Sequence, residues 1–91
     1  MANFTVRVEL HDAREHHYET LHSEMEKRGF EKTIEGNDAI FELPPGEYNI
    51  IRTATRTEIL DLADAAIKVT GRKSAVLVTE GSRTWRRLDK A

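Results

Sequence analysis

The chain contains no cysteine and only two prolines among its 91 residues. The lack of cysteine excludes a disulfide framework, a thiolate zinc site and a cysteine nucleophile, and it fits a reducing compartment. No apolar run approaches the length that spans a membrane, and the N-terminus lacks the basic start and apolar block of a signal peptide. These absences predict a cytoplasmic protein that has no membrane partner.

Neither sign of charge dominates, because 14 Lys and Arg residues are set against 16 Asp and Glu residues, for a formal net charge of −2. This balance argues against bulk electrostatic coating of nucleic acid, so DNA is not an expected partner. The C-terminal part nevertheless gathers basic residues at Arg72, Lys73, Arg83, Arg86, Arg87 and Lys90. A local basic patch can bind phosphate on a neutral protein, so an RNA-binding role stays open.

The first half of the chain reads as a strand, a helix and a hairpin. Apolar residues alternate with polar ones over residues 4–10, the period of a half-buried strand. Asp12 and Glu15 then form a capping-box pattern that predicts a helix, and Gly29 suits its end. Residues 30–35 and 39–43 flank a turn of Gly, Asn and Asp, which predicts a β-hairpin. Residues 47–52 are either a resumed strand or a loop across the sheet edge.

The second half reads as one helix and one strand. Thr55 and Glu58 make a second capping box, and Gly71 marks the end of the helix. The apolar run of residues 75–78 suits a central strand that is buried on both faces. Residues 83–91 form a short basic tail after a single domain of residues 1–82.

The element order β-α-β-β-α-β predicts an α+β, ferredoxin-like fold, with a four-stranded antiparallel sheet and both helices on one face. The first and last strands should then lie side by side in the middle of the sheet. We expect the uncovered face to show Thr5, Arg7 and Glu9 beside Val76 and Val78. Such a face commonly binds RNA, a ligand or a second copy, so a homodimer through this face or a sheet edge is expected.

The histidines are His11, His16, His17 and His22, and no pair of them has the one-turn spacing of a helical zinc site. His22 flanks the apolar stripe of the first helix, where a partly shielded imidazole could transfer protons near neutral pH. The alternative is a boundary histidine that bonds to a neighbour. Asp12 is the best magnesium ligand by position, but its capping role is favoured, so we expect no cofactor.

The tail places Trp85 among Arg83, Arg86 and Arg87. A base can stack on the indole while guanidinium groups engage phosphates, as in readers of single-stranded RNA. The alternative is that Trp85 anchors the tail to the domain or across a dimer, with its arginines in solvent.

Two runs, Asn3–Leu10 and Tyr18–Phe30, resemble the small bacterial and prophage proteins grouped with the GhoS antitoxin, and residues 43–48 and 75–80 continue the likeness. The resemblance implies an endoribonuclease antitoxin of a type V toxin–antitoxin system, which cleaves toxin messenger RNA. It also implies a fold similar to the ferredoxin-like CRISPR-associated endoribonucleases. By position, Asp12 is nearest to the metal-binding carboxylate of those relatives, while His22, with Arg28 later, occupies the basic position of the first helix.

Metal-free RNA cleavage needs a base for the 2′-hydroxyl, a cation for the phosphorane and an acid for the leaving oxygen. His22 or His11 could transfer the protons, and Arg7, Arg28 or the tail arginines could stabilise the charge. We therefore predict a sequence-preferring endoribonuclease acting on single-stranded messenger RNA. The competing hypothesis is a non-catalytic module that binds RNA or a protein through the open sheet face.

Overall fold

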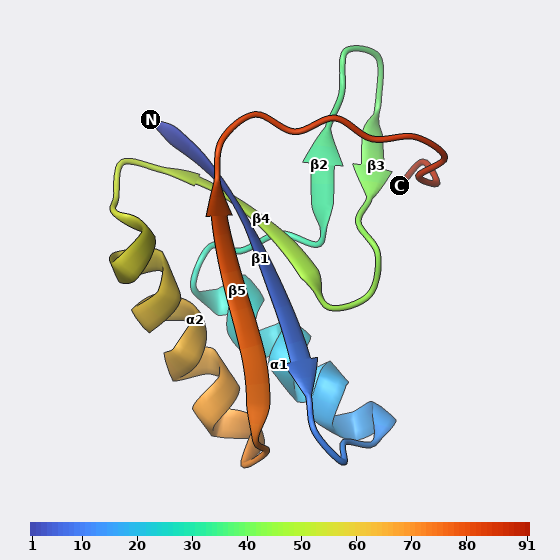
Figure 1. The fold of residues 1–91 in the computed structure, drawn as a ribbon. Helices are drawn as coiled ribbons and strands as arrows, with labels where there is room; N and C mark the ends of the chain where they lie inside the picture. The colour runs from blue at the N-terminus through green and yellow to red at the C-terminus, as the bar shows by residue number, and fades with distance from the viewer.

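The computed structural model describes residues 1–91 and forms two layers, with an antiparallel sheet on one side and two helices on the other (Figure 1). The strands are β1 (Ala2–Leu10), β2 (Thr33–Glu35), β3 (Ile40–Glu42), β4 (Glu47–Arg52) and β5 (Ser74–Glu80). The helices are α1 (Glu15–Lys27) and α2 (Arg56–Thr70). The α+β class, both helices and the hairpin agree with the sequence patterns. None of the helices is both long and apolar enough to cross a membrane.

The main sheet has three strands in the order β4-β1-β5, and both pairings are antiparallel. The central strand β1 places Val6 opposite Tyr48 of β4 on one side and opposite Val78 of β5 on the other. The ambiguous residues 47–52 are therefore a strand. The first and last strands do lie side by side, but only the first is central, because β5 forms an edge.

The expected single four-stranded sheet is not what the structure contains. The hairpin of β2 and β3 is a separate two-stranded sheet, and an isolated bridge between Glu31 and Asn49 pairs the chain just before it with the main one. The hairpin instead packs within itself and against the tail. Its buried residue Ile34 lies opposite Phe41, and the Phe41 ring lies 5.7 Å from that of Trp85. The hairpin therefore has packing partners of its own outside the main sheet.

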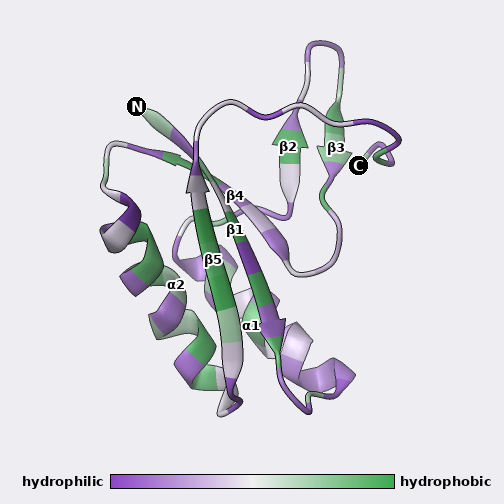
Figure 2. Ribbon diagram, in the orientation of Figure 1, coloured by the Kyte–Doolittle hydropathy of each residue, from purple (hydrophilic) through white to green (hydrophobic).

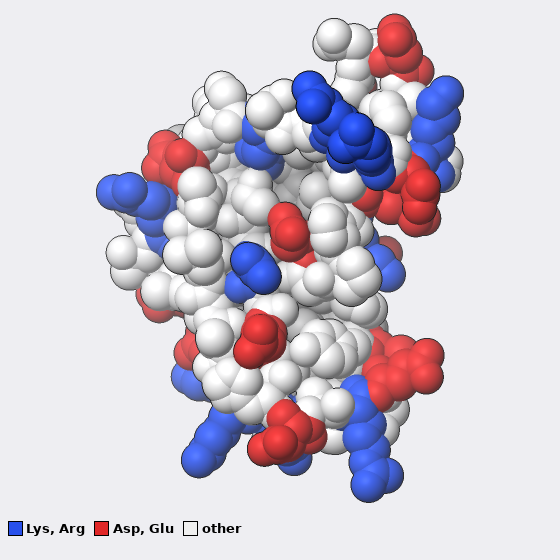
Figure 3. Space-filling view, turned by 45° about the vertical axis from the view of Figure 1, so that its right-hand side comes forward, with Lys and Arg blue, Asp and Glu red and all other residues white.

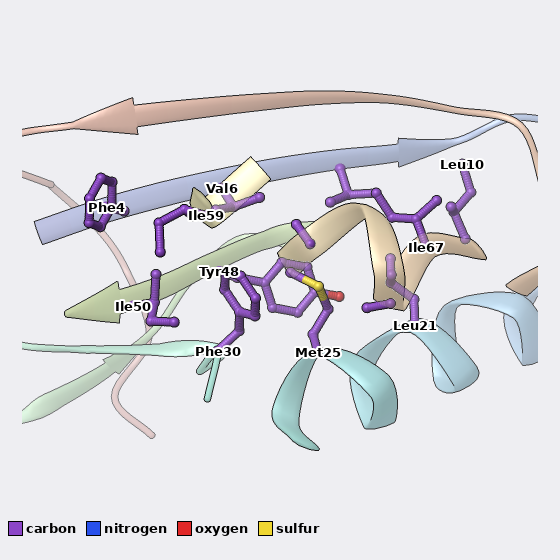
Figure 4. Close-up of a cluster of buried hydrophobic side chains, with 13 residues drawn as sticks. Phe4, Val6, Leu10, Leu21, Met25, Phe30, Tyr48, Ile50, Ile59 and Ile67 are labelled. Carbon is purple, nitrogen blue, oxygen red and sulfur yellow. The ribbon is translucent and has the colours of Figure 1, made fainter. Parts of the chain in front are cut away.

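The core lies between the sheet and the helices, as Figure 4 shows for side chains from β1, β4, α1 and α2 that point toward one another. The even-numbered residues of β1 from Phe4 to Leu10 are all buried, which confirms the alternating pattern. Two fully buried alanines, Ala63 and Ala66, let α2 approach the sheet closely. Figure 2 shows the matching alternation of hydrophobic and hydrophilic residues along α2.

The start of α1 differs from the expected capping box. The helix begins at Glu15 with Arg14 as its N-cap, and the backbone N–H of Arg14 donates to His17 Nδ1 at 2.9 Å. Asp12 instead lies exposed in the preceding turn, with a positive φ of 51°. Aspartate tolerates this left-handed conformation better than most residues, so the turn uses it there. The predicted cap of α2 by Thr55 and Glu58 is confirmed.

The β5 residues on the open face of the sheet also differ from those expected. Val76 and Val78 point toward the helices and pack against the core, so they are not on the uncovered face. That face carries Leu77, which lies opposite Arg7 and is 61% exposed. The run was expected to be buried on both faces, but here only one face of the strand is covered.

Candidate functional site

A cleft with a volume of about 380 Å³ lies where α1, the hairpin, the loop before β4 and the C-terminal tail meet. Most of its lining residues are polar or charged, and Pro44, Pro45 and Gly46 form one wall. The remaining lining residues are His22, Lys32, Thr33, Glu42, Leu43, Glu47, Arg87, Leu88 and Asp89. Two predicted functional residues far apart in the sequence, His22 and Arg87, therefore share one cleft.

His22 is held by a buried tyrosine. Its half-buried ring projects from the middle of α1, and Nδ1 shares a short hydrogen bond with the hydroxyl of Tyr48 on β4. The Tyr48 side chain is only 1% exposed, and burial raises the pKa of its phenol well above the usual range. The phenol therefore stays protonated, and the hydrogen bond fixes the orientation of the imidazole.

The surroundings of His22 favour its neutral form. Burial lowers the pKa of His22 first, the nearby Lys32 ammonium lowers it further, and Glu19 opposes both effects. A neutral imidazole at physiological pH can accept a proton, which is what a general base requires. His22 therefore fits proton transfer, while its bond to Tyr48 also matches the boundary histidine of the alternative interpretation.

Charges of both signs line the cleft. Lys32 and Arg87 contribute cations, whereas Glu42, Glu47 and Asp89 contribute carboxylates. Figure 3 shows basic and acidic groups side by side near the hairpin and tail, with further charges of both signs over the rest of this face. The cleft is therefore no continuous basic groove, and any phosphate would have to bind at Lys32 and Arg87.

The C-terminal tail forms part of this cleft because it is bound along the hairpin. The backbone N–H of Glu42 donates to Asp89 O at 2.8 Å, and that of Ala91 donates to Ile40 O at 2.9 Å. Arg87 has a positive φ of 61°, a local bend in the segment that enters the cleft. This docking supplies one wall of the cleft and brings a cation to it.

Trp85 and Arg83 both anchor the tail. Trp85 packs on Phe41, and Arg83 donates to Phe4 O at 3.0 Å and to Thr5 Oγ1 at 3.3 Å. Burial lowers the pKa of Arg83. These contacts match the alternative in which Trp85 anchors the tail to the domain. The Arg83 guanidinium is likewise bonded to β1 of the same molecule.

The other predicted site residues lie outside the cleft. His11 is at the far end of β1, where its N–H donates to Lys73 O and its ring lies 3.7 Å from the Glu9 carboxylate. Arg28 donates to both the backbone oxygen and the carboxylate of Glu24 on its own helix. Arg7 is exposed on the open sheet face, and Arg86 is exposed on the tail.

Asp12 lies exposed in the turn after β1, and no group of three or more His, Cys, Asp and Glu side chains is placed to hold a metal ion.

Sequence reasoning missed Lys32 and Tyr48. Tyr48 reads as one apolar residue of a strand, and nothing in its spacing links its hydroxyl to a helix 26 positions earlier. Lys32 is one unremarkable basic residue before the hairpin. The Pro-Pro-Gly sequence was the one available signal, because it marks a stiff loop that can form a wall.

Comparison of the chain with protein-family models, with curated proteins and with solved structures found no match. The fold and the cleft themselves describe a small α+β protein in which a histidine–tyrosine pair lies at a polar cleft.

Proposed function

We propose that this protein is an endoribonuclease that cleaves single-stranded messenger RNA at the His22 cleft, in the manner of the GhoS-like antitoxins that the sequence resembles. The observation that carries the proposal is the oriented, neutral His22 imidazole in a cleft that also contains Lys32 and Arg87. This combination supplies a base and cations for a phosphate, two requirements of metal-free RNA cleavage.

The ferredoxin-like assignment belongs to the same proposal. The strands β4, β1 and β5 would be three of its four strands, with both helices on one face. The bridge between Glu31 and Asn49 lies beside β4, where the fourth strand would run. In this interpretation the chain that leads into β2 begins the fourth strand at Glu31 and leaves the sheet after that one residue.

The proposed reaction uses the tautomer in which His22 Nδ1–H donates to the Tyr48 oxygen. Nε2 is then free to take the proton of a ribose 2′-hydroxyl as the 2′-oxygen attacks phosphorus. Lys32 and Arg87 stabilise the negative charge of the phosphorane. The 5′-oxygen leaves with a proton from water, and a 2′,3′-cyclic phosphate remains. No step of this scheme requires magnesium.

The cleft carboxylates fit a single-stranded substrate. Glu42, Glu47 and Asp89 would repel a dense array of phosphates, whereas one splayed nucleotide brings only one phosphate to the two cations. A single-stranded segment can also turn a base into the cleft, which a paired helix cannot do without opening. The substrate that the resemblance implies is the messenger RNA of a small membrane toxin.

The test is cleavage of a single-stranded transcript by the purified protein, with and without EDTA. We expect EDTA-insensitive cleavage that falls about a hundred- to ten-thousand-fold in His22→Ala, because a general base is lost. The matched control is His16→Ala, an exposed histidine of the same helix. On the tail, Arg87→Ala should weaken cleavage more than Arg86→Ala, because only Arg87 lines the cleft.

Two outcomes would contradict the proposal. If a folded His22→Ala protein cleaves normally, His22 is only a boundary histidine. If the protein binds the transcript tightly without cleaving it, the non-catalytic RNA-binding module is favoured, and a loss of binding in Arg7→Ala would then assign it to the open sheet face. Circular dichroism of each variant checks that the fold is intact.

A further inference from the structure

The outer edge of β5 has no partner within the molecule. β1 uses its odd-numbered residues to bond with β5, since His11 N–H donates to Lys73 O and Gly81 N–H donates to Asn3 O. By the alternation of an antiparallel ladder, the backbone groups of Ser74, Val76, Val78 and Glu80 point away from β1. The opposite edge of the sheet is different, because the bridge from Glu31 to Asn49 covers part of β4.

This free edge also lacks the features by which proteins protect edge strands. Residues 74–79 contain no charge, no proline and no glycine, and their pairing with β1 is continuous from Ser74 to Glu80 without a bulge. Natural edge strands are usually short, charged, kinked or covered, because an open row of N–H and C=O groups recruits another strand. The six uncharged residues from Ser74 to Thr79 therefore leave this edge free to pair with another strand.

The strand is complementary to a second copy of itself. When two β5 strands pair in antiparallel fashion about a two-fold axis at Leu77, Val76 lies opposite the partner's Val78, and Ala75 lies opposite the partner's Thr79. The outward-pointing Val76 and Val78 groups then form hydrogen-bonded pairs, each exchanging two backbone bonds. This register pairs the whole strand and sets no like charges against each other.

Leu77 gains most from this register. Its side chain is 61% exposed on the open face, and on the two-fold axis it would lie against the partner's Leu77 in a non-hydrogen-bonded pair, where side chains come closest. We propose that the protein forms a symmetric homodimer through β5, in which two three-stranded sheets become one continuous sheet. The His22 cleft is built from α1, the start of β4, the hairpin and the tail, so both clefts stay open.

The test is sedimentation equilibrium of wild-type protein and of Leu77→Lys, from micromolar to high micromolar concentration. We expect a wild-type dimer, and a dissociation constant at least about tenfold weaker in Leu77→Lys, since two charges replace an apolar pair. Val69→Lys is the matched control, because Val69 is 53% exposed but lies on α2 and not on β5. This control should dimerise like wild type.

A second measurement separates the edge contact from general damage to the fold. Mixing Leu77→Lys with Leu77→Glu places opposite charges on the proposed axis and should restore dimerisation that is weakened in each variant alone. A monomeric wild-type protein at high micromolar concentration would overturn the proposal. So would equal dimerisation of Leu77→Lys and Val69→Lys, or a mixture that stays monomeric.

Discussion

At the scale of single residues, the pairing of His22 with Tyr48 links the surface of the protein to its core. Tyr48 belongs to the buried cluster and lies against β1, while its hydroxyl is the group that holds the His22 ring. A buried phenol requires a hydrogen-bond partner, and a half-buried imidazole requires an orienting group. Each side chain therefore satisfies the other.

The lowered pKa of His22 predicts how stability depends on pH. In the unfolded chain the ring takes up its proton at a higher pH than in the native state, so stability falls as pH drops through about 6.5 toward the native pKa. Denaturant unfolding between pH 7.5 and 5.5 should therefore show a smaller loss in His22→Gln than in wild type. Burial and the neighbouring His16 also lower the pKa of His17. His17 is present in both proteins, so its contribution cancels in the comparison. Equal losses would contradict the prediction.

The sequence identified His22 but misjudged the residue that caps its helix. The pattern of Asp12 and Glu15 satisfies the rule for a capping box, yet the rule fixes only spacing and not where the chain leaves the strand. The helix starts later, and the backbone N–H of Leu10 donates to the Tyr18 hydroxyl at 3.0 Å, which ties the end of the strand to the first turn. That contact depends on the packing of β1 against α1.

At the scale of elements, Gly46 controls how β4 enters the sheet beside the cleft. Its φ is +85°, its carbonyl accepts the N–H of Val8 at 2.8 Å, and an added Cβ would lie 2.7 Å from the Val8 oxygen. Any other residue would therefore combine left-handed strain with a collision against backbone. Gly46 fixes both the first residues of β4 and the wall of the cleft.

We expect Gly46→Ala to lower the free energy of unfolding clearly more than Gly71→Ala. The control Gly71 also has a positive φ, of +71°, but an added Cβ there meets nothing within 4 Å. Its substitution should cost only the left-handed strain, about 1 kcal/mol. Urea unfolding of both variants measures the difference, and equal effects would show that β4 can shift away from Val8 without loss.

The sequence predicted helices and strands correctly where their periodic patterns were long, but it did not fully predict which strands lie beside one another. The alternation along β1 and the apolar face of α2 are local patterns, so the structure confirms them. The apolar run in β5 fits an edge strand as well as a central one, because burial depends on which strands lie beside it. The hairpin likewise packs on Trp85, a residue far away in the sequence that no local pattern links to it.

At the scale of the whole molecule, the tail holds two sheets together. It leaves β5, crosses to the hairpin and pairs with β3, so it connects the main sheet to the smaller one (Figure 1). The hairpin's other link to the main sheet is the bridge from Glu31 to Asn49. The shape of the cleft between these parts therefore depends on the docking of the tail.

We expect Trp85→Ala to loosen the tail without unfolding the main sheet. Loss of the contact with Phe41 should speed hydrogen exchange at the amides of Glu42 and Ala91, which bond across the junction of tail and hairpin. The amide of His11, which bonds to Lys73 within the main sheet, should be unchanged and serves as the internal control. Uniformly faster exchange at all three amides would instead mean that Trp85 stabilises the entire fold.

The central position of β1 has a consequence for the order in which the protein folds. This first strand is the scaffold of the sheet, yet its long partner β5 is the last element, and their register joins Phe4 to Glu80. Before residues so distant in sequence can form stabilising contacts, the chain must close a long loop at a cost in entropy, which makes folding slow. During synthesis, one edge of β1 therefore stays unpaired until β5 has left the ribosome.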